Sequence, residues 1–147
     1  MTKYTDEFLI EGANYNRLLS DYLKHGSLTI GFDFDGTVHD FHKTGQTYHQ
    51  VIELLRDLKS IGCKLVCWTA YENLDYVNNY LYEHKIPCDA INEGGIPLPW
   101  ESKKPFFSAL LDDRAGLKEM FETLTKLVET IKQIKSSAKR REFIKIN

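Results

Sequence analysis

Two carboxylates follow the apolar segment 28–32, in the stretch "DFDGT" that contains Asp33 and Asp35. Alternate residues of an extended chain point to the same side, so both side chains can face one site. A second acidic pair, Asp112 and Asp113, ends another apolar segment. Four carboxylates in one crevice repel one another unless a cation lies between them. Because an oxygen-rich ligand set suits Mg²⁺, the pattern predicts a divalent metal site.

Other polar residues extend this chemistry. Thr69 ends a further apolar segment, and the pair Lys103 and Lys104 precedes the one that ends in Asp112. Together with a metal, such residues suit phosphoryl transfer, because metal and lysine neutralise the charge of the phosphate. One carboxylate can act as the nucleophile and form an acyl phosphate, while another moves protons. Gly36 permits a tight turn whose backbone N–H groups can hold a phosphate.

The apolar pattern also predicts the elements that bring these residues together. Strands are expected at 27–33, 63–69, 88–92 and 107–113, and helices at 14–24, from about Thr47 to Gly62, at 73–84 and at 115–136. This alternation predicts a doubly wound, Rossmann-like α/β fold with a parallel sheet of about four or five strands and helices on both faces. Ligands of such folds bind outside the carboxyl ends of the strands, where all the candidate residues would lie.

The ordered set of "DFDGT", Thr69, the lysine pair and "LLDD" resembles the four motifs of the haloacid dehalogenase-like (HAD) hydrolase superfamily, over roughly residues 27–116. The resemblance implies that Asp33 is the nucleophile and Asp35 the general acid and base. It gives the lysine role to Lys104 or Lys103, and Pro105 after Lys104 favours Lys104. It places Mg²⁺ and phosphate on these residues: Asp33, Asp112, Asp113 and the Asp35 backbone carbonyl for the metal, and Gly36, Thr69, Ala70 and Lys104 for the phosphate.

The resemblance also bears on the substrate. The segments 38–47 and 69–104, where large cap domains of the family are inserted, are too short to hold one. We therefore expect a small capless phosphatase that acts on a phosphorylated metabolite or a nucleotide monophosphate. One alternative is a polynucleotide end-processing phosphatase, which an open site and the basic tail at 137–147 favour. Another is a non-catalytic module that binds phosphate or nucleotide, although a binder has no need of Asp35.

Composition sets the remaining expectations. The 147 residues are 42% hydrophobic with a net charge of −2, which favours neither nucleic acid nor a membrane surface as partner. We expect a single domain at 1–147: a helical extension at 1–26, the motif-bearing core at 27–116, and a helix with a partly loose basic tail at 117–147. The apolar stripe of that last helix leaves monomer and homodimer open.

Two smaller expectations concern histidines and cysteines. His39 and His42 follow the first acidic pair, where surface loop positions are the commoner explanation and substrate contact is the alternative. The three cysteines, Cys63, Cys67 and Cys88, are odd in number and lie in apolar surroundings. They are expected to be reduced thiols of a cytoplasmic protein, since the N-terminus lacks a signal-peptide pattern.

Overall fold

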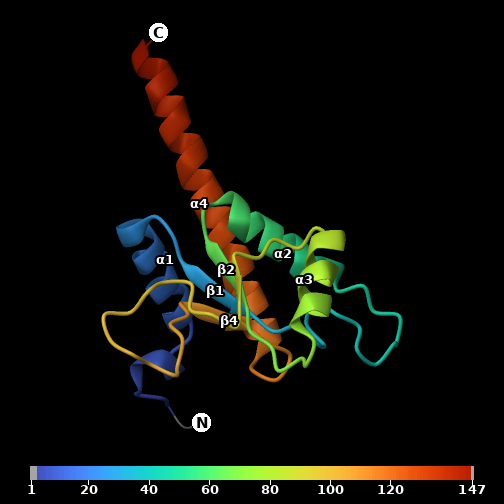
Figure 1. Ribbon diagram of the computed structural model, residues 1–147. Coiled ribbons are helices and arrows are strands. Elements are labelled where there is room, and N and C mark those ends of the chain that lie inside the picture. The colour runs from blue at the N-terminus through green and yellow to red at the C-terminus, as the bar shows by residue number, and fades with distance from the viewer. Residues whose placement is uncertain (1–2, 147) are drawn as a thin grey trace.

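The computed structural model describes residues 3–146 and confirms an α/β fold (Figure 1). Its helices are η1 (Glu7–Leu9), α1 (Ala13–His25), α2 (His49–Ser60), α3 (Leu74–Glu83) and α4 (Leu117–Ile146). Its strands are β1 (Thr29–Phe32), β2 (Lys64–Cys67), β3 (Ala90–Ile91) and β4 (Ala109–Leu111). Each predicted helix and strand is present, and no large cap domain interrupts the described chain.

The four strands form one parallel sheet in the order β3-β2-β1-β4. Phe32 of β1 pairs with Cys67 of β2 and with Leu111 of β4, so these three strands end level with one another. The residues that follow them, including Asp33 and Asp112, therefore emerge at the same edge of the sheet. This shared edge is the place where ligands of parallel α/β sheets bind.

A single apolar core joins the sheet to the helices. Side chains from β1, β2 and β4 pack with side chains from all four α-helices, and the largest fully buried ones include Phe32, Leu55, Leu65, Leu111 and Leu124. Each such side chain stabilises the fold by about 1.5–3 kcal/mol through its removal from water. Helix α4 contacts α1, α2 and β4, and its C-terminal part extends beyond the rest of the chain (Figure 1).

The long connection between β3 and β4 lies directly on the sheet. A Cβ atom added at Gly31 would come within 3.0 Å of the Phe107 ring, and one added at Gly95 within 2.7 Å of the Thr29 methyl carbon. Both glycines therefore permit contacts that a larger residue would prevent. As a result, the connection formed by residues 93–108 packs closely against the sheet at these two points.

Two local predictions were wrong. The basic tail was expected to be partly loose, but α4 continues to Ile146, because its Lys, Arg, Ala and Glu residues favour helix. Helix α2 begins at His49 rather than near Thr47, and its N-cap residue, Tyr48, makes no capping hydrogen bond through its side chain. Asn147 lies outside the described residues.

The structure also bears on the cysteines and on membrane-spanning helices. The three cysteines are free thiols, as predicted, and Cys63 and Cys67 are buried. A search of the described residues finds no helix with the length and apolar character that crossing a membrane requires.

Candidate active site

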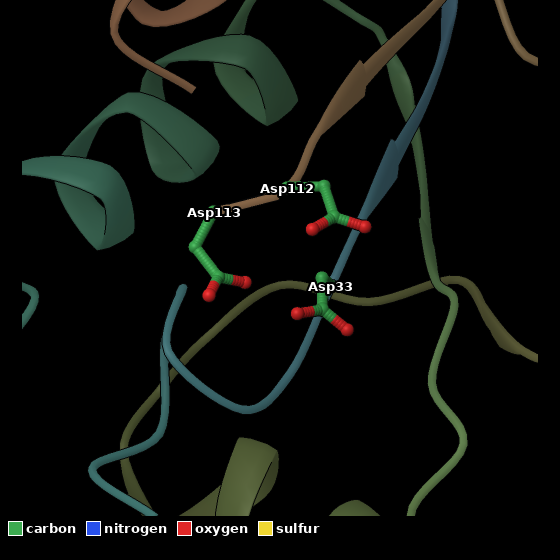
Figure 2. Close-up of side chains that lie close together, drawn as sticks. All are labelled: Asp33, Asp112 and Asp113. Atoms are coloured by element: carbon green, nitrogen blue, oxygen red, sulfur yellow. The ribbon is translucent and has the colours of Figure 1, made fainter. Parts of the chain in front are cut away.

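Three carboxylates meet where β1 and β4 end (Figure 2). Asp33 follows β1, and Asp112 and Asp113 follow β4; each offers one oxygen atom within 4.8 Å of the others. Asp33 and Asp112 are half-buried, whereas Asp113 is exposed. The Asp33 N–H donates to the carbonyl of Leu111 at 2.9 Å, so the sheet itself fixes the spacing of the two chain segments. The predicted juxtaposition of the acidic pairs is therefore present for these three residues.

The electrostatics of the cluster favour a cation. The pKa of Asp33 is raised from 3.8 to about 7, first by burial, then by its hydrogen bond with Asp113 and by the charge of Asp112. A raised pKa means that the third negative charge is disfavoured while nothing positive lies among the carboxylates. Three convergent carboxylates supply the hard oxygen ligands that Mg²⁺ prefers. The residues present therefore fit such an ion in both ligand type and charge.

Gly36 and Thr37 hold Asp113 in place from the loop after β1. Gly36 has φ of +79°, and a Cβ atom there would lie 2.8 Å from Oδ2 of Asp113. The buried Thr37 hydroxyl accepts a hydrogen bond from the Asp113 N–H at 3.1 Å and donates to its Oδ1 at 3.4 Å. The stretch "DGT" thus supports the carboxylate that arrives from β4, in addition to carrying Asp35.

The side chain of Asp35 has a different partner. Its Oδ1 lies 2.7 Å from Nδ1 of His39, and Nε2 of His39 lies 3.1 Å from the Tyr76 hydroxyl. The interpretation of His39 as a surface residue was wrong, since it is 8% exposed and its ring stacks on Phe34 at 4.5 Å between centroids. The reason is a tight turn in which the His39 N–H donates to the Phe34 carbonyl and the Gly36 N–H donates to the His39 carbonyl.

Thr69 is held at the end of β2 by Asn92 and its own turn. Its N–H donates to Oδ1 of Asn92 and its carbonyl accepts from Nδ2 of Asn92, both at 2.8 Å. Its Oγ1 accepts from the Tyr71 N–H at 3.0 Å, which leaves the hydroxyl proton for another acceptor. Thr69 and Ala70 line a cavity of about 470 Å³ together with Asp33 and Asp112. We call it the central cavity.

Lys103 and Lys104 lie beside this cavity, not in it. Both line an adjoining pocket that shares Trp68 and Asn92 with the central cavity. Of the ion pairs formed within residues 3–146, none joins either lysine to Asp33 or to its acidic neighbours. The structure therefore brings the predicted lysine to the rim of the site but not into contact with the carboxylates.

A larger cavity of about 730 Å³ shares Asp33, Ala70 and Asp112 with the central cavity, and Gly36 and Asp35 lie in its wall. Sequence reasoning missed most of the other residues that line it: Phe41, Tyr71, Glu72, Asn73 and Arg114. Their positions in the sequence could have indicated them, because each follows a strand end or a predicted site residue within a few positions. The exposed His42 also lines this cavity, which agrees with the alternative of substrate contact.

Comparisons with known proteins bear on the fold. No family model and no curated protein matches the sequence. The chain is similar to the solved structure of a conserved protein from Bacteroides thetaiotaomicron, with a TM-score of 0.55 and 24% identity over 68% of this chain and 91% of that one. A second solved structure, from Vibrio cholerae, gives a TM-score of 0.44 at 25% identity over 70% of this chain and 98% of that one. The first likeness shows a shared fold over the matched part of this chain.

Proposed function

We propose that this protein is a Mg²⁺-dependent phosphomonoester hydrolase of the HAD-like type, working through an aspartyl-phosphate on Asp33. The observation that carries the proposal is the meeting of Asp33 with Asp112 and Asp113 at the carboxyl edge of a parallel sheet. Asp35 lines the larger cavity and Thr69 the central cavity, and Asp33 and Asp112 line both. If Asp33 and Asp35 only formed a solvated turn, neither the acidic pair that follows β4 nor the hydrogen bond between Thr37 and Asp113 would be needed.

Asp33, Asp112 and Asp113 would hold the metal, with the backbone carbonyl of Asp35 as a further ligand. When bound, Mg²⁺ supplies positive charge that offsets the negative charge of the phosphate and of the three carboxylates. Arg114, which lines the larger cavity, adds a positive side chain to the same region. An anionic substrate can therefore approach a cluster that would otherwise repel it.

The reaction divides into two displacements at phosphorus. In the first, a carboxylate oxygen of Asp33 bonds to phosphorus and the bond from phosphorus to the ester oxygen breaks, while protonated Asp35 gives its proton to that leaving oxygen. In the second, water bonds to phosphorus and gives a proton to the Asp35 carboxylate. The bond from phosphorus to Asp33 then breaks, which releases inorganic phosphate and restores both carboxyl groups.

His39 acts in this scheme as a positioning residue. With the ring proton on Nδ1, His39 donates to Oδ1 of Asp35, and the other carboxyl oxygen can carry or release the transferred proton. That contact holds one oxygen of Asp35 and leaves the other for proton transfer with the leaving group or water. The buried, stacked position of the His39 ring fixes this orientation.

A direct assay tests the proposal. We expect hydrolysis of phosphate monoesters that requires Mg²⁺, stops with a chelator and is lost in Asp33→Asn, which keeps the shape of the side chain but removes the nucleophile. Asp6→Asn is a matched control, because Asp6 is exposed and makes no capping hydrogen bond through its side chain. Full activity in Asp33→Asn, or equal activity without a divalent metal, would refute the mechanism.

The position of the basic tail does not favour a polynucleotide end as substrate. Lys139, Arg140, Arg141 and Lys145 lie near the C-terminal end of α4, whose first residue follows Asp113 closely. With a rise of 1.5 Å per residue, about 33 Å of helix separate Leu117 from Lys139. These cations therefore add no charge around the reacting phosphate at Asp33, and without that support the phosphorylated-metabolite or nucleotide function is preferred.

A further inference from the structure

The only two tryptophans of the chain, Trp68 and Trp100, line the same pocket. This tryptophan pocket has a volume of about 300 Å³, and its other lining residues include Asn92, Lys103, Lys104 and Phe106. Trp68 is 36% exposed, Phe106 49% and Trp100 66%. Three aromatic side chains are thus accessible to a ligand around a pocket that also carries two ammonium groups.

The tryptophan pocket adjoins the central cavity. Trp68 and Asn92 line both, and Asp33 and Asp112 also line the central cavity. Trp68 follows β2 directly, its N–H donates to the Phe32 carbonyl at 2.8 Å, and its ring meets Phe107 edge-on at 5.8 Å. Asn92 is fixed by its two hydrogen bonds with Thr69. The wall that the two spaces share is therefore held by contacts with β1 and Thr69, and one ligand can extend along it from one space to the other.

The lining chemistry selects the class of ligand. A purely apolar molecule would leave Lys103 and Lys104 without a partner, and a sugar phosphate would leave the aromatic faces unused. A planar heteroaromatic base stacks on aromatic side chains, and its ring nitrogens or the adjacent phosphate can accept hydrogen bonds from the lysines. The volume is at the lower end for ligand sites, which suits one base. Resting on the proposed function, we infer that the substrate is a nucleoside monophosphate with its base in the tryptophan pocket.

Intrinsic fluorescence tests this binding without any turnover, because both tryptophans report on the pocket. We expect adenosine to quench the emission of the wild-type protein saturably, while ribose leaves it unchanged. In Trp100→Leu the remaining Trp68 signal should show an affinity for adenosine at least about fivefold weaker, as expected for loss of one stacking partner. Tyr82→Leu is the matched control, since Tyr82 is 86% exposed and lies outside the pocket.

A selectivity measurement tests the same inference in catalysis. We expect kcat/KM to be higher for adenosine monophosphate than for ribose 5-phosphate, and Trp100→Leu to reduce this ratio about tenfold. Tyr82→Leu should keep the wild-type ratio. Equal selectivity in wild type and Trp100→Leu would overturn the inference, as would a preference for a phosphorylated oligonucleotide over the mononucleotide.

The two proposals fail in distinguishable ways. If no phosphate ester is hydrolysed but adenosine still quenches the tryptophans and Trp100→Leu weakens that binding, the phosphatase function is wrong and the base pocket stands. If esters are hydrolysed in a Mg²⁺-dependent manner and adenosine neither quenches the emission nor competes with substrate, the base pocket is wrong and the phosphatase function stands.

Discussion

Nδ1 of the buried His39 lies 2.7 Å from Oδ1 of Asp35, and the two residues are also joined by a backbone bridge. The ring is held on its other side by the hydroxyl of Tyr76 and by stacking on Phe34. Of the acidic residues after β1, Asp33 therefore joins the cluster with Asp112 and Asp113, while the Asp35 side chain is oriented separately. This separation is what a nucleophile and a proton-transfer group require.

The first prediction concerns His39→Phe, which keeps an aromatic ring on Phe34 but removes the contact with Asp35. If His39 orients Asp35 for proton transfer, kcat/KM, which reports the first displacement, should fall about tenfold or more for alkyl phosphates, whose leaving oxygen needs a proton. The loss should be much smaller for p-nitrophenyl phosphate, whose leaving group departs without one. Steady-state kinetics on both substrates measure the difference.

A merely structural role of His39 would reduce both rates equally, and that outcome would contradict the assignment. Tyr76→Phe provides the graded control, since it removes only the outer hydroxyl, 3.1 Å from Nε2, and keeps the contact with Asp35. Its effect on alkyl phosphates should be smaller than that of His39→Phe.

The second prediction concerns Gly36→Ala. The new methyl group would lie 2.8 Å from Oδ2 of Asp113, so the carboxylate must move away from its neighbours. Mg²⁺ affinity, measured by isothermal titration calorimetry, should fall at least about tenfold because one of three carboxylate ligands is displaced. Gly26→Ala is the matched control: Gly26 also has positive φ, +74°, but a Cβ atom there meets nothing within 4 Å. Equal Mg²⁺ affinity in the two variants would show that Gly36 does not position Asp113.

The third prediction follows from the pKa of Asp33, which burial and its acidic neighbours raise to about 7. A carboxyl group with a raised folded-state pKa makes the metal-free protein lose stability as pH rises from about 4 to about 7, because the folded state then holds a proton that the unfolded state has released. Asp33→Asn should therefore raise Tm in chelator at about pH 8 and have little effect at about pH 3, where both states are protonated.

Metal addition supplies the complementary measurement. Mg²⁺ should raise Tm of the wild-type protein at neutral pH, since a ligand that binds the folded state stabilises it. The same addition should shift Asp33→Asn far less. A wild-type Tm that does not respond to Mg²⁺ would contradict the metal site itself, whatever the behaviour of the variant.

Much of the fold was predictable because its signals are local. Apolar segments that end in polar residues marked the strands, and Gly26 and Gly62, both with positive φ, marked the ends of helices. The first residue of α2 was harder to predict, because the Thr47 hydroxyl forms a hydrogen bond with Nδ1 of His49 and does not cap a helix N–H. The continuation of α4 was missed because a run of charged residues is compatible with either a solvated helix or a loose tail.

The candidate site also contains residues that the sequence could predict and residues that it could not. Asp33, Asp112 and Asp113 were predictable, because strands of a parallel sheet deliver their next residues to one edge. The environment of His39 was not, because it depends on Tyr76 from α3, a contact across 37 positions of the chain. The place of the lysines could not be predicted either, because residues 93–108 form no helix or strand. The path of this connection depends on its close contacts with the sheet at Gly31 and Gly95.

The last prediction separates the two lysines. The Lys104 backbone is fixed by reciprocal hydrogen bonds with the Ser102 hydroxyl, at 2.9 and 3.1 Å, and Pro105 restricts it further to extended conformations. Lys103 has no such anchor among the hydrogen bonds of the described residues, so Lys104 has the better-fixed backbone of the two lysines beside the central cavity. Lys104→Met, which keeps the length of the side chain but removes its charge, should lower kcat about a hundredfold through lost transition-state stabilisation. Lys103→Met should lower it far less, and the reverse order in phosphatase kinetics would assign the role to Lys103.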